Sequence, residues 1–108
     1  MLSTEQNVDK LIREAIGEKH LLQFVYQGKK RVVEPHDYGI YKGSVKLLAY
    51  QVGGSSSGRI PNWRWIEVDQ IADIELLSRT FTGGRPTPTG QHHQWEVLYA
   101  RVGPADEK

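Results

Sequence analysis

The sequence predicts a small, mainly β domain of the α+β class, with an N-terminal helix followed by five to six short strands that form a small barrel or a sandwich. One helical pattern near the N-terminus gives way to a two-residue alternation from Leu21 to Leu77, interrupted by turn-forming residues. A length of 108 residues suits one domain. Short strands with frequent turns suggest a small barrel or a sandwich, and we expect a closed cylinder because closure hides the exposed sheet edges.

The N-terminal segment has the spacing of an amphipathic helix. Its apolar side chains recur at intervals of three and four residues and form one stripe: Val8, Leu11, Ile12, Ala15 and Ile16. Ser3 and Gln6 have the spacing of a capping box at the helix start. We expect the helix to end at Gly17 or to continue to Lys19.

After His20 the pattern predicts two hairpins. The first turns at Gln27-Gly28 and stops at Pro35, which cannot donate to a strand ladder. The second turns at Lys42-Gly43. The predicted strands are Leu22 to Tyr26, Lys30 to Val33, Tyr38 to Tyr41 and Ser44 to Val52.

The next segment, Gly53 to Gly58, is expected to be a mobile hairpin loop, because it has no apolar side chain. An alternating strand follows over Trp63 to Val68. Asp69 then caps one helical turn, Gln70 to Ala72, before a last strand around Ile74 to Leu77 that ends near Phe81. Residues 1–81 should therefore hold the helix and the barrel.

Residues 82–108 are expected to form an extension. Thr82 to His93 is rich in Gly, Pro and Thr and should be extended or disordered. Beyond it, helical spacing suggests a short docking helix, although alternation of the same residues equally suits one further strand. The residues with both patterns are Trp95, Val97, Leu98, Tyr99 and Val102.

Composition excludes several kinds of chemistry. Cysteine is absent, so disulfides and thiolate sites are excluded, and the polar N-terminus suggests a cytoplasmic protein without a membrane segment. His92 and His93 lack further ligands nearby, and we expect no metal and no cofactor. No nucleophile elbow is present, and the acidic candidates, Glu34, Glu67 and Asp69, show no pairing. We therefore expect no enzymatic activity.

Several segments together resemble a WYL domain over about residues 11 to 81: Ala15 to His20, Phe24 to Tyr26, Val33 to His36, Gly43 to Tyr50 and Trp63 to Ile71. Such domains usually follow a winged-helix DNA-binding module in bacterial transcription regulators. The resemblance implies an Sm-like, SH3-like small barrel that senses a ligand. In a chain of this length we expect no winged-helix module.

The chain departs from the family pattern at polar positions. Where the family has Trp-Tyr-Leu, this sequence has Val45, Lys46 and Leu47. Two arginine positions of the family correspond to Glu67 and Gln70. The resemblance therefore supports the fold more firmly than the binding activity.

Four residues are the candidate ligand contacts: Lys46, His36, Tyr50 and Arg64. His36 either donates to an anionic ligand or caps its loop by a hydrogen bond. Lys46 lies among apolar neighbours, so its ammonium reaches either an anion or, more simply, solvent. Arg64 alternates with two tryptophans, which we expect to cover the core or the helix while Arg64 reaches outward.

Basic and aromatic residues suggest two further surfaces. Lys29, Lys30 and Arg31, with Arg59 on another loop, are either a nucleic-acid contact or a solvated hairpin tip. A protein interface would use the large aromatic side chains Trp63, Trp65, Trp95 and Tyr99.

These observations lead to two hypotheses. The first is a non-catalytic regulatory domain of the WYL type, which binds a small anionic or nucleotide-like ligand, or single-stranded nucleic acid, and signals through a separately encoded partner. The alternative is a protein-interaction or homo-oligomerisation module with a degenerate ligand site. Duplex DNA is disfavoured, because the net charge is only +1 and no recognition helix is visible.

Overall fold

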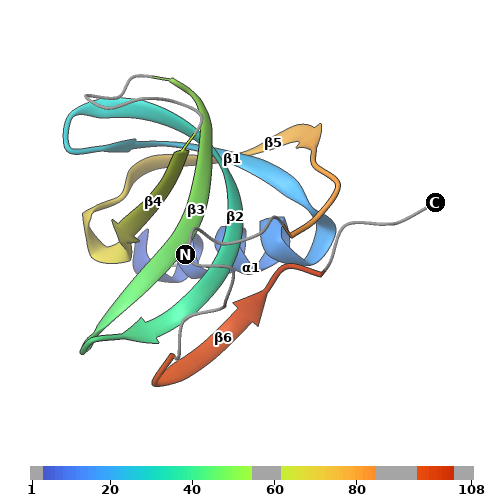
Figure 1. Ribbon diagram of the computed structural model, residues 1–108. Helices are drawn as coiled ribbons and strands as arrows, with labels where there is room; N and C mark the ends of the chain where they lie inside the picture. The colour runs from blue at the N-terminus through green and yellow to red at the C-terminus, as the bar shows by residue number, and fades with distance from the viewer. Residues whose placement is uncertain (1–3, 55–61, 85–94, 104–108) are drawn as a thin grey trace.

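A computed structural model describes residues 4–54, 62–84 and 95–103 of the chain. In these ranges the protein has one α-helix and a six-stranded antiparallel sheet (Figure 1). The elements are α1 (Thr4–Glu18), β1 (His20–Tyr26), β2 (Lys29–Tyr41), β3 (Ser44–Gly54), β4 (Asn62–Glu67), the 3-10 helix η1 (Val68–Gln70), β5 (Ala72–Thr80) and β6 (Val97–Arg101). The prediction of a mainly β fold with an N-terminal helix is confirmed.

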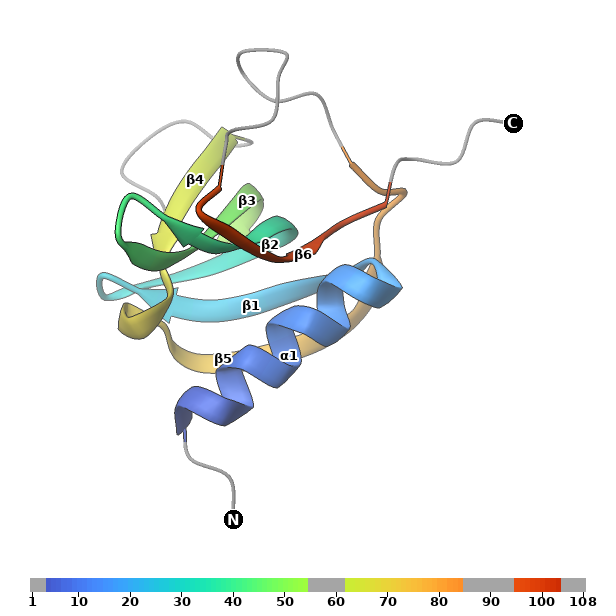
Figure 2. The same ribbon diagram turned by 90° about the horizontal axis from the view of Figure 1, so that it is seen from below.

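Helix α1 lies across one face of the sheet (Figure 2). The predicted apolar stripe is buried, with Val8, Ile12, Ala15 and Ile16 in the core. The helix ends at Glu18, and Lys19 adopts a left-handed backbone with φ 59°, so Gly17 is not its cap. Ser3, and with it the predicted capping box, lies outside the described residues.

The sheet is strongly bent, and its strand order is β4-β3-β2-β1-β5 (Figure 1). Strands β4 and β5 stand at the two ends of this path, and in the described part of the chain they do not pair with each other. The expected closed cylinder is therefore not formed by the described hydrogen bonds. Core side chains such as Phe24, Leu47 and Ile66 fill the inside of the bend, beneath the helix.

Strand β2 runs without a break through Pro35, so the prediction that a strand ends there is wrong. The register with β3 shifts between Pro35 and Asp37, which leaves His36 as the extra residue of a bulge. The first part of β2 pairs with β1, and the part beyond the bulge pairs with β6. Proline is tolerated because the bulge interrupts the ladder at the point where β2 changes neighbours.

Residues 97–101 form strand β6, so the docking helix is wrong and the alternative of a further strand is correct. Strand β6 lies very close to β2 at Gly39, where a Cβ atom would collide with the carbonyl oxygen of Val97. An ion pair between Arg101 and the buried carboxylate of Asp37 joins the same two strands. Part of the predicted extension therefore belongs to the sheet.

The turn between β4 and β5 also differs from its prediction. Helix η1 starts at Val68, its N-cap position is Glu67, and no side chain caps it, so the expected cap by Asp69 is wrong. Strand β3 continues through Gly54. The rest of the predicted loop, residues 55–58, and most of the Thr82 to His93 segment, residues 85–93, lie outside the described residues.

Candidate functional site

Two arginines meet at one glutamine on the inner side of the bent sheet. The Nη1 of Arg31 and the Nε of Arg64 both donate to Oε1 of Gln51, each over 3.2 Å. Gln51 is fully buried and Arg31 is 6% exposed. We call these three residues the guanidinium cluster.

Arg31 is an unusual buried cation. Its Nε donates to the carbonyl oxygen of Tyr26, and its guanidinium lies 5.4 Å from the centre of the Tyr26 ring. Burial lowers the pKa of Arg31, and the nearby positive charge of Arg64 lowers it further. A buried charge is normally stabilised by an opposite charge. The contacts of Arg31 within the described residues are instead with neutral groups.

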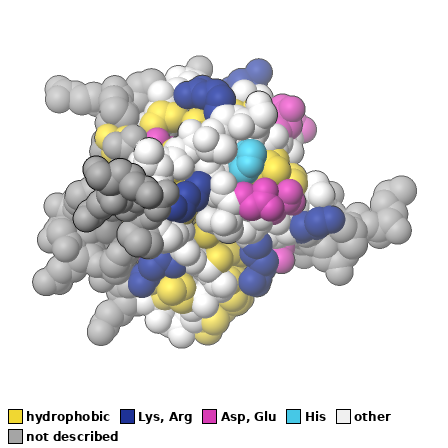
Figure 3. Space-filling view, turned by 90° about the vertical axis from the view of Figure 1, so that its right-hand side faces the viewer, with side chains coloured by type: hydrophobic (Ala, Val, Ile, Leu, Met, Phe, Trp, Pro, Cys, Tyr) yellow, Lys and Arg dark blue, Asp and Glu magenta, His cyan; other side chains and the backbone are white. Residues whose placement is uncertain are grey.

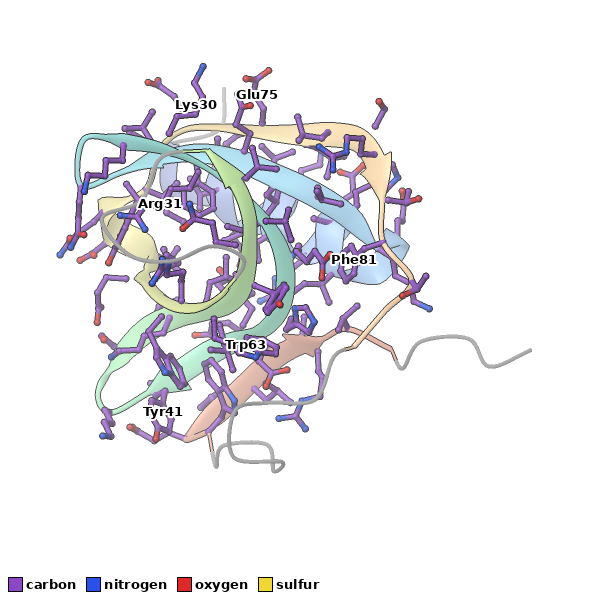
Figure 4. All side chains as sticks on the ribbon, turned by 45° about the horizontal axis from the view of Figure 1, so that its top comes forward. Lys30, Arg31, Tyr41, Trp63, Glu75 and Phe81 are labelled. Atoms are coloured by element: carbon purple, nitrogen blue, oxygen red, sulfur yellow. The ribbon has the colours of Figure 1, made fainter. Side chains whose placement is uncertain are left out.

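The backbone explains why these side chains converge. Gln51 shares the inner face of β3 with Leu47 and Ala49, and Arg64 shares the inner face of β4 with Ile66. Arg31 lies on the inner side of β2, whereas Lys30 points away from it (Figure 4). The described residues thus enclose a polar cluster at one end of the apolar core.

The four predicted ligand contacts do not gather at one point. Arg64 belongs to the guanidinium cluster, on the face of β4 opposite to its two tryptophans, so the expectation that it reaches outward is wrong. His36 and Tyr50 both contact Trp63 on the outer face. Lys46 lies further along β3 in an ion pair. The ligand-binding role of each residue stays a prediction.

Lys46 is held by its neighbours rather than extended into solvent. Its Nζ lies 3.1 Å from Oε2 of Glu67, directly opposite on β4, and also donates to the carbonyl oxygen of Tyr41 and to Oγ of Ser44. Hydrogen bonds from Ser44 and Lys46 lower the pKa of Glu67. Lys46 therefore reaches an anion, the carboxylate that the strand register supplies, and the preferred expectation that its ammonium reaches solvent is wrong.

His36 is buried at the bulge of β2. Its Nδ1 lies 2.8 Å from the carbonyl oxygen of Glu34, so His36 makes a local hydrogen bond as predicted, but within a continuous strand and not as the cap of a loop. Its ring packs edge-on against Trp63, at 4.7 Å between centres, and against Phe81 at 5.6 Å. Figure 4 shows Trp63 and Phe81 on the same side of the molecule. His36 thus joins β2, β4 and the end of β5.

A second aromatic group lies on the outer face at the far end of β2 from Arg31 (Figure 4). The rings of Tyr41 and Trp65 are stacked at 4.8 Å between centres, and Trp95 lies 5.7 Å from Trp65. We call these three residues the aromatic cluster. Trp65 is 38% exposed, and within the described residues the buried indole N–H of Trp95 has no hydrogen-bond partner.

The predicted interface residues are divided between two sides. Trp63, Trp65 and Trp95 lie on the outer face, so the expectation that Trp63 and Trp65 cover the core or the helix is wrong. Tyr99 instead packs against Tyr38 in the core, and Arg13 of α1 lies over its ring. No single surface presents all four aromatic residues.

The basic turn is also divided. Lys30 is exposed, but Arg31 is buried, so a wholly solvated hairpin tip is wrong. The side chain of Lys29 is partly exposed, and Arg59 lies outside the described residues. Figure 3 shows one face of the molecule, where basic and acidic side chains are interspersed. That face is the right-hand side of Figure 1, whereas the β1–β2 turn lies at the left of Figure 1, so a nucleic-acid contact by the basic turn stays a prediction.

Within residues 4–54, 62–84 and 95–103 no group of three acidic or histidine side chains is placed to hold a metal ion. The helix described in this part of the chain is neither long nor apolar enough to cross a membrane.

Comparisons of the chain with family models, with curated proteins and with solved structures find no match.

Proposed function

We propose that this chain is a non-catalytic ligand-sensing domain of the WYL type, which binds an anionic ligand and signals its presence to a partner protein. The observation that carries the proposal is the buried guanidinium of Arg31 beside that of Arg64, with a neutral amide oxygen between them. An anion at this place would be attracted by both guanidinium groups, and Arg31 in particular is largely shielded from water.

An SH3/Sm-like small barrel is part of the same proposal. The strand order β4-β3-β2-β1-β5 comes from a single bent sheet, and the 3-10 helix η1 connects the strands at its two ends. Bringing those ends together would form a small barrel with the guanidinium cluster on its inside. The family resemblance in the sequence supports the same arrangement.

Titration with nucleotides and short single-stranded oligonucleotides tests the binding proposal. Trp63 and Trp65 flank Arg64, so we expect their fluorescence to change on binding and the thermal midpoint to rise with ligand concentration. Arg31→Gln should abolish both effects. Lys30→Gln removes the neighbouring exposed charge and should leave them unchanged. A flat response in fluorescence and in thermal midpoint across all ligands would refute the proposal.

A second candidate function is a protein-interaction or oligomerisation module. It is favoured by the exposed apolar side chains of Trp65, Val97 and Leu98, which are 38%, 46% and 41% exposed. Aromatic side chains contribute strongly to the energy of interfaces. In this case Trp65→Ser should lower the molar mass measured by light scattering at high concentration. A monomer before and after the substitution would exclude self-assembly.

A further inference from the structure

Gln51 lies between two guanidinium groups in the described protein interior. Its Oε1 accepts hydrogen bonds from two guanidinium groups, and its Nε2 donates to the carbonyl oxygen of Gly53 over 3.0 Å. An amide oxygen carries only a partial charge, whereas two arginines are matched best by an oxyanion. The amide oxygen of Gln51 is therefore a weaker acceptor for these two arginines than an oxyanion would be.

We propose that the guanidinium cluster binds a terminal phosphate group of the ligand, and that Gln51 Oε1 takes the place of a phosphate oxygen until the ligand arrives. This inference rests on the proposed function, for which it names the class of ligand. Binding turns the Gln51 side chain away from Arg31 and Arg64, whose hydrogen-bond donors then face the phosphate oxygens.

The two arginines fit a phosphate by charge and by geometry. A terminal phosphate carries close to two negative charges at neutral pH, whereas a carboxylate or an internal phosphodiester carries one, so two neighbouring guanidinium groups attract a terminal phosphate most strongly. Arg31 is already oriented, because its Nε bonds to Tyr26 while its Nη1 points to Gln51. This preorganisation reduces the entropy lost on binding.

The enclosure of the cluster favours the end of a ligand over the middle of a polymer. Arg31 is 6% exposed and Gln51 is fully buried. Arg31 is paired across the ladder with Gly54, where a Cβ atom would collide with the carbonyl oxygen of Lys30. The β2 and β3 backbones are thus in close contact beside the cluster. A nucleic-acid strand passing through would need a groove open in both directions, whereas a phosphate at the end of a ligand needs one opening.

The decisive variant is Gln51→Glu, which places a carboxylate between the two arginines. We expect it to mimic the bound phosphate, so that the variant is more stable than the wild type without ligand. Its affinity for phosphate should fall at least about tenfold, because the added charge competes for the same donors. Gln51→Ala removes the competing oxygen and should retain phosphate binding. The exposed variant Lys30→Gln is the matched control and should behave as the wild type does.

The probes are inorganic phosphate, adenosine monophosphate, cyclic adenosine monophosphate and an oligonucleotide without terminal phosphates, at constant ionic strength. Isothermal titration and the thermal midpoint measure binding by each protein. The inference requires that inorganic phosphate and adenosine monophosphate bind the wild type, and that their binding to the Gln51→Glu variant is lost. It is overturned if only the probes without a terminal phosphate bind, although the proposed function then survives. It is also overturned if Gln51→Glu binds phosphate as the wild type does. If none of the probes binds, both proposals fail.

Discussion

Replacing Arg101 by methionine should weaken the attachment of β6 to β2 and destabilise the domain. The Nε and Nη2 of Arg101 donate to the two carboxylate oxygens of Asp37 over 3.0 and 3.3 Å. The side chain of Asp37 is 2% exposed, whereas that of Arg101 is 33% exposed. Methionine keeps much of the apolar stem of the arginine but leaves the buried carboxylate without this partner.

The expected loss of stability is set by that difference in exposure. Removing one partner of a fully buried ion pair costs ~3–5 kcal/mol. Because Arg101 is one third exposed, water partly replaces its charge, and we expect a loss of about 2 kcal/mol. For a domain of this size that is a fall in thermal midpoint of roughly 8–15 °C. Urea unfolding followed by circular dichroism gives the free energy directly.

A double-mutant cycle with Asp37→Asn separates the charge from the packing. Once residue 37 is neutral, Arg101→Met should cost less than about 1 kcal/mol, since the lost hydrogen bonds then join the arginine to a neutral amide and not to a buried charge. The matched control is Arg79→Met on the exposed surface of β5, which should change stability by less than about 0.5 kcal/mol. Equal losses for Arg101→Met in both backgrounds would refute the reasoning.

Three further changes test the packing of α1 and the electrostatics of the outer face. Ile12 is fully buried, so Ile12→Ala should lower the free energy of unfolding by about 2–4 kcal/mol in urea, and a loss below 1 kcal/mol would mean that α1 is not packed. Tyr38→Phe removes a 2.6 Å hydrogen bond to the partly exposed Asp9 and should cost about 1 kcal/mol by the same measurement; no loss would contradict it. The pKa of Glu67 is lowered, chiefly by the Ser44 hydroxyl, so its stabilisation is present above the usual glutamate range and is lost as the pH falls through the lowered value. Glu67→Gln should therefore make the thermal midpoint less sensitive to acid, and an unchanged acid dependence would contradict this.

Local patterns were enough to predict the elements whose geometry depends on near neighbours. The apolar stripe of α1 could be predicted because residues three and four positions apart in the sequence lie on the same side of a helix. The turns at Gly28 and Gly43 follow from their positive φ values of 75° and 85°, which glycine adopts at little cost. The alternation in β3 likewise predicted that Leu47 and Ala49 share one face, which in the structure is the inner face.

Register was needed to place the charged side chains. The pattern in β3 put Lys46 beside Tyr50 on one face, but only the pairing of β3 with β4 sets Glu67 directly opposite its ammonium group. In the same way Arg31 looks like the third cation of an exposed turn. Its burial follows from the pairing of β2 with β3, which brings Gln51 beside it, and from the pairing of β3 with β4, which brings Arg64 to the same place.

The sequence by itself determined one amphipathic helix, an alternating series of strands and the turns between them, because each depends on residues a few positions apart. The tertiary structure alone decided that β2 continues through Pro35 and that residues 97–101 extend the sheet. It also decided that two arginines meet at Gln51. These features depend on contacts between residues far apart in the chain, whose side chains carry no local signal of the partner they will meet.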